Sequence, residues 1–374
     1  MKDKILNVGV LGAGRWAQGA HIPGWKRDPR VRVVAVCDPQ LHLAQEAGRT
    51  FNIPTVTGDH REVIGRNDID VIDVCTTSKT HFELTMQALE AGKHVLCEKP
   101  VGHGFKQTLQ ARDLARSKGL KTKLGFTFRY SPAMQYMKEL INNGYVGTPY
   151  IFNGYEQNSQ WISPETPLRQ EGEIAFLDQS KIHVASLEGY GAPIIDLGHW
   201  FMNSDLTQVV GTMRNFIPER VVRDTGKMMH VNIDDGDIFI GEFASGALCS
   251  VQTSFVTVGN YPGLEARVYG SKGALICRLV EEFGVCESLK GAKPDAVEFK
   301  DIPIPERLYP PGGSSRESWR TLFYANLTSN FATEILSNTP SQGDFNDGAW
   351  VQEVINAVEM SFRQHAWVKL PLPR

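Results

Sequence analysis

Short apolar runs and amphipathic segments alternate through the first third of the chain. The apolar runs are rich in β-branched residues, and helical patterns such as THFELTMQALEAG (80–92) separate them; they are ILNVGVLG (5–12), VRVVAVCD (31–38), DVIDVCTT (70–77) and HVLCEK (94–99). This alternation predicts βαβ units around a parallel sheet. Strands that are apolar almost throughout suit a sheet covered on both faces. We expect this domain to end with the strand KTKLGFTF (121–128).

The pattern changes after Arg129. A helical segment, PAMQYMKELINNG (132–144), leads into longer strands with alternating polarity, at 150–158, 206–216, 237–255 and 266–279. The turns in FASGAL and YGSKGAL contain glycine, which is typical of antiparallel hairpins. Amphipathic patterns at 317–336 and 347–365 predict two helices that pack back on the body of the molecule. We therefore predict an α/β chain with a doubly wound domain over 1–128, and an α+β domain with a large, mostly antiparallel open sheet over 129–374.

Composition narrows the class of protein. The chain has 374 residues, which is long for one hydrophobic core, and 41% of them are hydrophobic, so two packed domains are expected. The net charge of −3 gives no basic footprint for nucleic acid or anionic membranes. The opening MKDKILNVGVLGAG has no cleavage site, and no apolar stretch is long enough to span a bilayer. These features predict a soluble, cytoplasmic protein.

The six cysteines fit a reducing compartment. They form no CxxC pair and no zinc spacing with histidine, so we expect reduced thiols, mainly buried, and no metal site; they are Cys37, Cys75, Cys97, Cys249, Cys277 and Cys286.

A glycine-rich turn follows the first strand. The segment from Gly12 to Ala17 fits G-x-G-x-x-G/A and leads into a helical pattern. Gly12 would permit the tight turn, Gly14 would let the backbone approach a pyrophosphate, and Ala17 would let the helix pack close to the strand. Unpaired N–H groups at the helix start suit phosphate oxygens. The pattern predicts a Rossmann dinucleotide site that also includes Arg15 and Trp16.

Asp38 closes the second strand at the distance where an acidic residue meets the adenosine ribose. A carboxylate there accepts hydrogen bonds from both ribose hydroxyls and repels a 2′-phosphate, which favours NAD over NADP. The alternative is a loop residue that caps the next helix.

Three segments at the carboxyl ends of later strands carry a family resemblance. They are Thr76–His81 (TTSKTH), Cys97–Pro100 (CEKP) and Gly125–Tyr130 (GFTFRY). With the VGVLGAG opening, they make the whole chain resemble the family of glucose-fructose oxidoreductase, inositol dehydrogenase and MocA (Gfo/Idh/MocA). The resemblance implies a Rossmann domain and an α/β domain whose open sheet often forms an oligomer interface, here a homodimer or homotetramer. It also implies a cleft for a carbohydrate substrate.

By the same resemblance, Lys99 contacts the reacting oxygen. An ammonium group near the nicotinamide could hydrogen-bond a carbonyl or alkoxide and assist proton transfer. The alternative is an exposed lysine paired with Glu98. The cofactor site would further include Thr76, Thr77, His81 and Glu98.

One segment departs from the family pattern. Polyol dehydrogenases of the family usually carry an Asp and a His four residues apart in the second domain, followed by another Asp and a Trp. If Trp200 sets the register, Asp196 is the later aspartate, and Gly189 and Pro193 replace the usual pair. The other register pairs Asp196 with His199. Asp196 is a candidate in both.

Proton transfer then needs a partner for Lys99, for which His183, Tyr130 and Asp178 are candidates. Arg129 would anchor an anion or bridge the domains. Trp161, Trp200 and Arg169 could line a sugar site. The polar stretch 159–187 is either a substrate-facing loop or a surface insertion.

Three functions compete. The first is an NAD-dependent oxidoreductase that moves hydride between nicotinamide and a secondary hydroxyl or ketone of a sugar, cyclitol or glycoside. The second is a glycosidase that oxidises a ring hydroxyl transiently, eliminates the aglycone and re-reduces the product; the missing Asp and His pair keeps it open. The third is a non-enzymatic NAD sensor, which retention of Lys99 disfavours.

Overall fold

The computed structural model describes residues 4–259, 263–279 and 286–374. By its internal contacts the chain divides into two compact units. Unit 1 comprises Met1–Pro132 and Pro305–Gln352, and unit 2 comprises Ala133–Ile304 and Glu353–Arg374. The start of the opening segment, residues 1–3, lies outside the described residues. No helix in the described ranges has the length and hydrophobicity to cross a membrane.

Unit 1 is built on a six-stranded parallel sheet in the order β3-β2-β1-β4-β5-β6. Its strands are β1 (Leu6–Leu11), β2 (Val31–Cys37), β3 (Thr55–Thr57), β4 (Val71–Val74), β5 (His94–Cys97) and β6 (Thr122–Leu124). The strand order reverses between β1 and β4, where doubly wound sheets bind ligands at the strands' carboxyl ends. The predicted parallel Rossmann sheet is confirmed.

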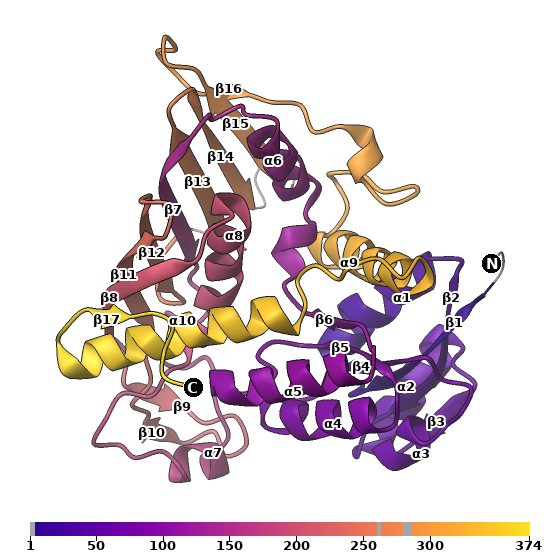
Figure 1. Cartoon of the computed structure of the whole chain (residues 1–374). Coiled ribbons are helices and arrows are strands. Elements are labelled where there is room, and N and C mark those ends of the chain that lie inside the picture. Colours follow the sequence, from indigo (N-terminus) through magenta and orange to yellow (C-terminus); the bar gives the residue numbers. More distant parts are fainter. Residues whose placement is uncertain (1–3, 260–262, 280–285) are drawn as a thin grey trace. The chain divides into compact units, whose positions relative to one another are not determined.

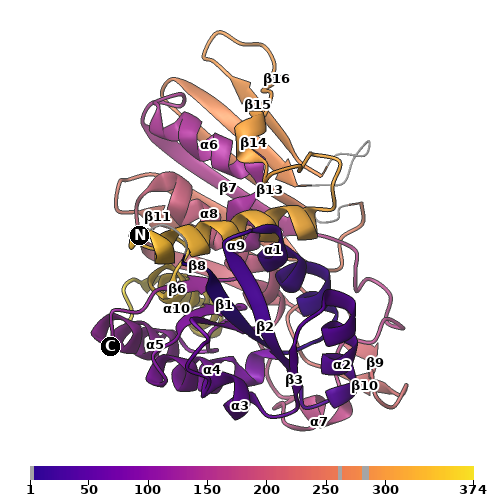
Figure 2. The same ribbon diagram turned by 90° about the vertical axis from the view of Figure 1, so that its right-hand side faces the viewer.

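Helices connect these strands and cover the sheet. They are η1 (Ala17–His21), α1 (Ile22–Arg27), α2 (Leu41–Phe51), α3 (His60–Ile64), α4 (Ser78–Glu90), α5 (Phe105–Ser117), η2 (Thr127–Tyr130), η4 (Glu306–Leu308) and α9 (Trp319–Leu336). Helices α4 and α5 run side by side, and α9 lies along α1 (Figure 1, Figure 2). Between them these helices bury both faces of the sheet, as the near-continuous apolar strands required.

The packing of α9 against α1 brings a late segment into unit 1. A Cβ atom on Gly24 would lie 3.0 Å from the carbonyl carbon of Tyr324, so a larger residue at 24 would require the two helices to move slightly apart. Trp25 packs on Phe331 with ring centroids 6.3 Å apart. The sequence predicted a single domain boundary after Phe128, and this boundary stays a prediction. The internal contacts, however, group Pro305–Gln352 with the Rossmann sheet.

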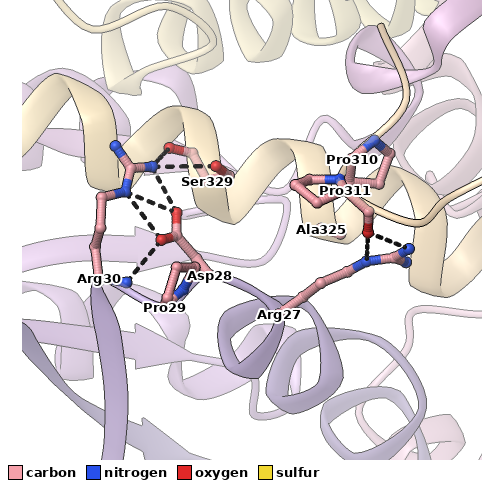
Figure 3. A pocket seen from close by; sticks show the side chains of 8 residues that line it. All are labelled: Arg27, Asp28, Pro29, Arg30, Pro310, Pro311, Ala325 and Ser329. Atoms are coloured by element: carbon pink, nitrogen blue, oxygen red, sulfur yellow. Dashed lines mark hydrogen bonds and ion pairs between the residues drawn. The ribbon is translucent and has the colours of Figure 1, made fainter. Parts of the chain in front are cut away.

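Two arginines reach from the end of α1 to the α9 region on either side of a cavity of about 240 Å³ (Figure 3). Arg27 donates to the carbonyl of Pro311 and pairs with Glu317, while Arg30 pairs with Asp28 and donates to Ser329. Both guanidinium groups are therefore engaged in joining the two segments.

Unit 2 contains a nine-stranded sheet in the order β16-β15-β14-β13-β7-β12-β11-β8-β17. Its strands are β7 (Pro149–Gln157), β8 (Leu206–Arg214), β11 (Gly236–Phe243), β12 (Leu248–Ser254), β13 (Leu264–Gly270), β14 (Gly273–Leu279), β15 (Ser288–Ala292), β16 (Lys300–Asp301) and β17 (Val368–Lys369). Strands β7 and β12 pair in parallel, and the other neighbours are antiparallel. The predicted mostly antiparallel sheet and its β11–β12 and β13–β14 hairpins are confirmed.

One face of this sheet carries helix α8 (Figure 1). Gly154 and Gly198 leave room for Ile194 and Phe152, which pack between strand and helix. Along β11 the buried Phe239 alternates with the exposed Ile238 and Ile240, so the opposite face presents apolar side chains to solvent. The remaining elements of this unit are α6 (Pro132–Asn142), α7 (Glu171–Ala175), η3 (Leu187–Gly191), α8 (Ala192–Met202), β9 (Glu219–Val221), β10 (Met228–His230) and the end of α10 (Phe345–Gln364).

All six cysteines are free and buried, as expected.

Candidate active site

The glycine-rich turn has the conformation that its residue types predict. Gly12 has φ of +96°, and a Cβ atom there would lie 2.3 Å from the carbonyl oxygen of Cys75. Gly14 is different, because a Cβ atom on it would meet nothing within 4 Å. Gly12 is therefore required by the close approach of the backbone at Cys75, whereas Gly14 borders open space. Behind the turn, Ala17 is fully buried in the core of unit 1, and Arg15 is exposed.

Asp38 ties the end of β2 to this turn. Its Oδ2 atom accepts the N–H of Ala13 at 2.8 Å, and its Oδ1 atom accepts the N–H of Gln40 at 2.8 Å. The second contact holds the N–H of Gln40, the residue before α2, so Asp38 fixes the backbone ahead of the helix and does not cap it. A carboxylate offers about four lone-pair sites, and the remaining ones leave it able to accept ribose hydroxyls.

The loop after β4 is linked to the loop after β5 through His81. The side chain is buried, and its Nδ1 and Nε2 atoms lie 2.7 Å from the carbonyl oxygen of Pro100 and 3.1 Å from that of Thr76. Thr76 accepts a hydrogen bond from Thr80 at 2.8 Å, and Thr77 precedes α4. Each ring nitrogen of His81 thus lies next to a carbonyl oxygen of one of the two loops. Contact of Thr76, Thr77 and His81 with a cofactor stays a prediction.

Lys99 lies in the loop after β5, at the carboxyl edge of the sheet, and is half-buried. The loop is held on both sides: Glu98 N–H donates to the carbonyl of Val74 at 2.9 Å, and Gly125 N–H donates to that of Cys97 at 2.8 Å. The backbone N–H of Lys99 donates to Oε2 of Glu98 at 3.2 Å. Lys99 and the glycine turn therefore stand at the same edge of the same sheet.

A buried polar network behind this edge was not found from the sequence. Nδ1 of His21 lies 2.9 Å from both carboxylate oxygens of Asp73, and its Nε2 lies 3.2 Å from Oε1 of Glu98. The same Oε1 accepts hydrogen bonds from the indole of Trp16, at 3.1 Å, and from the hydroxyl of Tyr324. One signal was available: Asp73 interrupts an otherwise apolar strand.

The charges in this network follow from its contacts. Burial alone would lower the pKa of His21, but the neighbouring Asp73 carboxylate raises it well above the ordinary value. Burial would raise the pKa of Glu98, yet the hydrogen bond and charge of His21, with the charge of Lys99, lower it to about 2. Glu98, predicted as a cofactor contact, thus has its carboxylate engaged inside the protein as an anion.

Two residues of unit 1 that the sequence suggested as site residues, Tyr130 and Arg129, bond to other groups of the protein. The hydroxyl of Tyr130 accepts a hydrogen bond from Lys123 at 2.9 Å and donates to the carbonyl of Gln342 at 3.1 Å. Burial lowers the pKa of Lys123 to about 8. Arg129 is 3% exposed and pairs with Asp347 at 2.9 Å. Their substrate roles remain predictions, whereas these contacts give both side chains a structural role.

In unit 2, the candidates Asp196 and His199 lie on α8. Asp196 is fully buried, and Nε2 of His199 lies 2.9 Å from Oδ1 of Asp205. Gly189 and Pro193, which replace the usual acid and base if Trp200 sets the register, stand in η3 and at the start of α8. His183 is half-buried, with Nε2 2.9 Å from the carbonyl oxygen of Asp178.

The polar stretch 159–187 has a small core of its own. Trp161 packs on Phe255 and Tyr190, with ring centroids 5.3 and 6.1 Å apart, and belongs to a cluster with Ile174 and Val222. The segment is thus anchored to unit 2 by apolar packing.

A pair of buried acids holds the start of the helix that carries Asp196. Asp234 accepts backbone N–H groups from Ala185, from Ser186 at 2.8 Å and from Leu187 at 2.9 Å. Burial raises the pKa of the neighbouring Asp237, and the charge of Asp234 raises it further. A charged Asp234 therefore caps the helix while Asp237 stays protonated. Sequence reasoning missed this pair.

Comparison with known proteins identifies both parts of the chain. Residues 6–126 match the Gfo/Idh/MocA oxidoreductase family, described as an NAD-binding Rossmann fold, and residues 134–276 match the C-terminal domain of the same group. Levoglucosan dehydrogenase of Pseudarthrobacter phenanthrenivorans is 25% identical, over 98% of this chain and 98% of its own. D-glucoside 3-dehydrogenase of Escherichia coli is 32% identical, over 40% of this chain and 43% of its own.

Solved structures agree on the fold. An NAD binding oxidoreductase from Klebsiella pneumoniae superposes with a TM-score of 0.88 at 22% identity, covering 99% of this chain and 100% of that one. Levoglucosan dehydrogenase in complex with NADH has a TM-score of 0.85 at 23% identity, covering 98% and 100%. With matches to both domains and an NAD-binding Rossmann fold in unit 1, the chain belongs to the Gfo/Idh/MocA family of oxidoreductases.

Proposed function

We propose that the protein is an NAD-dependent carbohydrate dehydrogenase, which moves hydride between nicotinamide and a secondary hydroxyl or ketone of a sugar, cyclitol or glycoside. The observation that carries the proposal is the placement of Lys99 and the Gly12–Gly14 turn at the carboxyl edge of one parallel sheet. Relatives named as levoglucosan, D-glucoside and inositol dehydrogenases support this substrate class.

In this proposal the Gly14 backbone faces the pyrophosphate, and Asp38 accepts hydrogen bonds from the ribose and selects NAD over NADP. The bound nicotinamide supplies or takes the hydride. Lys99 hydrogen-bonds the reacting oxygen and stabilises the negative charge that develops on it. Asp196 orients a substrate hydroxyl, and His183 and Tyr130 remain candidates for proton transfer. Trp161, His199 and Arg129 remain candidates for substrate contact.

Two measurements test the function. Calorimetry with NADH and NADPH should show binding that favours NADH. Incubation with NAD and levoglucosan, a methyl glucoside or myo-inositol should then release NADH, and Lys99→Ala should abolish this release while NADH still binds. No affinity for either coenzyme would exclude the proposed function.

The glycosidase alternative predicts a different product balance. Gly189 and Pro193, standing where the family's usual acid and base are expected, are the observation that favours it. A nitrophenyl glycoside assayed with NAD would then release nitrophenol catalytically without net NADH. NADH formation without nitrophenol release supports the dehydrogenase.

We also propose that copies associate as a homodimer or homotetramer through the exposed sheet face of unit 2. The exposed apolar side chains there are Ile151, Ile238, Ile240, Leu248 and Trp367. An apolar patch of this kind marks an interaction surface. Light scattering should give a mass of two or four chains for the native protein, and Ile240→Asp should shift it to one. The six buried free cysteines support a cytoplasmic location.

A further inference from the structure

The two oxygens of the Glu98 carboxylate have different partners. Oε1 faces the interior of unit 1, where it lies within hydrogen-bond distance of Trp16, His21 and Tyr324. Oε2 accepts the backbone N–H of Lys99 at 3.2 Å. One oxygen thus anchors the side chain inside the protein, and the other is hydrogen-bonded to the backbone of Lys99. A carboxylate displaced from this position would lose its contact with the backbone that carries the lysine.

His21 lies beside this carboxylate and holds it in place. It is fully buried, and both ring nitrogens face carboxylates, with Nδ1 at 2.9 Å from Asp73 and Nε2 at 3.2 Å from Glu98. Since a carboxylate only accepts hydrogen bonds, both nitrogens must carry hydrogen, and the ring is an imidazolium cation. Its raised pKa agrees with this charge. Nε2 of His21 therefore reaches Glu98 as a charged donor.

The groups around the ring keep the contact in place. The indole of Trp25 donates to Asp73 at 2.8 Å, and the Tyr324 ring lies over His21 with centroids 4.4 Å apart. Burial raises the pKa of Cys75 and of Tyr324, so both stay neutral near pH 7. Asp73 and Glu98 are the carboxylates next to His21, and the charge of Lys99 also acts on Glu98.

Little space remains for Glu98 to move. A Cβ atom on Gly125 would lie 2.6 Å from Oε1 and 2.8 Å from Cδ of Glu98, so a larger residue at 125 would force the carboxylate to shift. Gly125 belongs to the segment after β6, whereas His21 comes from the first helix and Tyr324 from α9. Three separate parts of unit 1 thus converge on one carboxylate.

We propose that His21, paired with Asp73, is a positioning residue that fixes Glu98 and, through it, the backbone that presents Lys99 to the reacting oxygen. This inference rests on the proposed function, because the contact of Lys99 with substrate is part of that function. His21 itself is enclosed in the protein and acts only through Glu98.

The test compares three variants of the full-length protein: His21→Asn, Glu98→Gln and Tyr324→Phe. His42→Asn is the control, because His42 is an exposed histidine on α2. NADH affinity, measured by calorimetry, should stay within about threefold of wild type in His21→Asn, Tyr324→Phe and His42→Asn, because these three residues stand outside the predicted cofactor site. With NAD and levoglucosan, kcat should fall about 10- to 100-fold in His21→Asn and Glu98→Gln, with a much smaller change in KM. Tyr324→Phe should give a smaller loss in the same direction.

A pH profile separates positioning from a general loss of structure. In the wild type the pKa of Glu98 is about 2, so its carboxylate stays ionised through the acidic range. In His21→Asn the burial remains and the stabilising cation is gone, so the pKa of Glu98 rises. The acid-side loss of kcat should therefore move to higher pH in this variant and stay unchanged in His42→Asn.

A second measurement needs no substrate. Labelling of Lys99 by trinitrobenzenesulfonate, followed by mass spectrometry, should run severalfold faster in Glu98→Gln and His21→Asn than in wild type or the control. If wild type binds NADH but oxidises none of the sugars, the proposed function fails, and labelling alone decides the positioning role. Wild-type labelling rates in both variants would overturn it. So would wild-type kcat in Glu98→Gln and Tyr324→Phe, even if His21→Asn does not fold.

Discussion

His21 and Asp73 form an ion pair in which one ring nitrogen lies 2.9 Å from both carboxylate oxygens, and neither side chain has any exposed surface. The histidine comes from the first helix and the aspartate from the middle of the sheet. The pair joins helix and sheet directly behind the loop that carries Lys99, so the chemistry and the stability of unit 1 share these groups.

Removing the anion of this pair should destabilise the protein strongly. In Asp73→Asn a buried imidazolium loses its counter-charge, and loss of one partner of such a pair costs about 3 kcal/mol or more. Urea unfolding at neutral pH should show this decrease. Asp68→Asn is the control, because Asp68 pairs with Arg66 at the surface and its loss should change stability little. Equal effects in the two variants would contradict the prediction.

The contribution of His21 to stability should depend on pH in a defined direction. The folded-state pKa of His21 is raised above that of the unfolded chain. Its stabilisation is therefore fully present below pH ~6.5, the ordinary pKa of histidine, and is lost as the pH rises through the raised folded-state pKa. The difference in unfolding free energy between wild type and His21→Asn should shrink across that alkaline range. A difference that grows with pH would show that His21 folds as a neutral ring.

Gly125→Ala should disturb Glu98 and lower stability and turnover together. The new Cβ atom would lie 2.6 Å from Oε1 of Glu98, and such overpacking costs about 1–3 kcal/mol. Melting temperature and kcat should both fall. Gly58→Ala is the matched control, because the nearest atom to its Cβ would be 3.8 Å away.

The two glycines of the turn should respond differently to alanine. Gly12→Ala places a Cβ atom 2.3 Å from a backbone oxygen at a positive φ, so it should destabilise the fold by about 1–3 kcal/mol. Gly14→Ala meets open space and should leave stability within about 0.5 kcal/mol of wild type. Its methyl group would nevertheless occupy the space assigned to the pyrophosphate, and NADH affinity should fall about tenfold or more. Thermal unfolding and calorimetry on both variants check this contrast.

Asp237→Asn should flatten part of the pH dependence of stability. The carboxyl group of Asp237 has a raised folded-state pKa, so it favours folding while protonated and opposes it as the pH rises through that pKa. Asparagine imitates the protonated form and can still accept the hydrogen bond that Thr253 now gives Asp237 at 3.1 Å. The variant should match wild type in acid and exceed it in stability above neutral pH. A loss of stability at every pH would contradict protonation of Asp237.

Much of unit 1 followed from the order of residues alone. The continuous apolar runs predicted buried parallel strands, and the glycine spacing predicted the turn at Gly12, because both leave a recognisable pattern of residue types within a short segment. The end of β5 also placed Lys99 at the correct edge of the sheet. Alternating polarity and the glycine-containing turns similarly predicted the hairpins and the mostly antiparallel sheet of unit 2.

The tertiary structure decided which polar groups meet. His21, Asp73, Glu98 and Tyr324 come from four separate segments, and residues as far apart as Glu98 and Tyr324 become partners only when α9 packs beside α1. The pairing of Arg129 with Asp347 and the capping of a helix by Asp234 arise in the same way. The amino-acid sequence itself determines elements through local periodicity, whereas a buried charge finds its partner through the packing of distant segments, which no local pattern records.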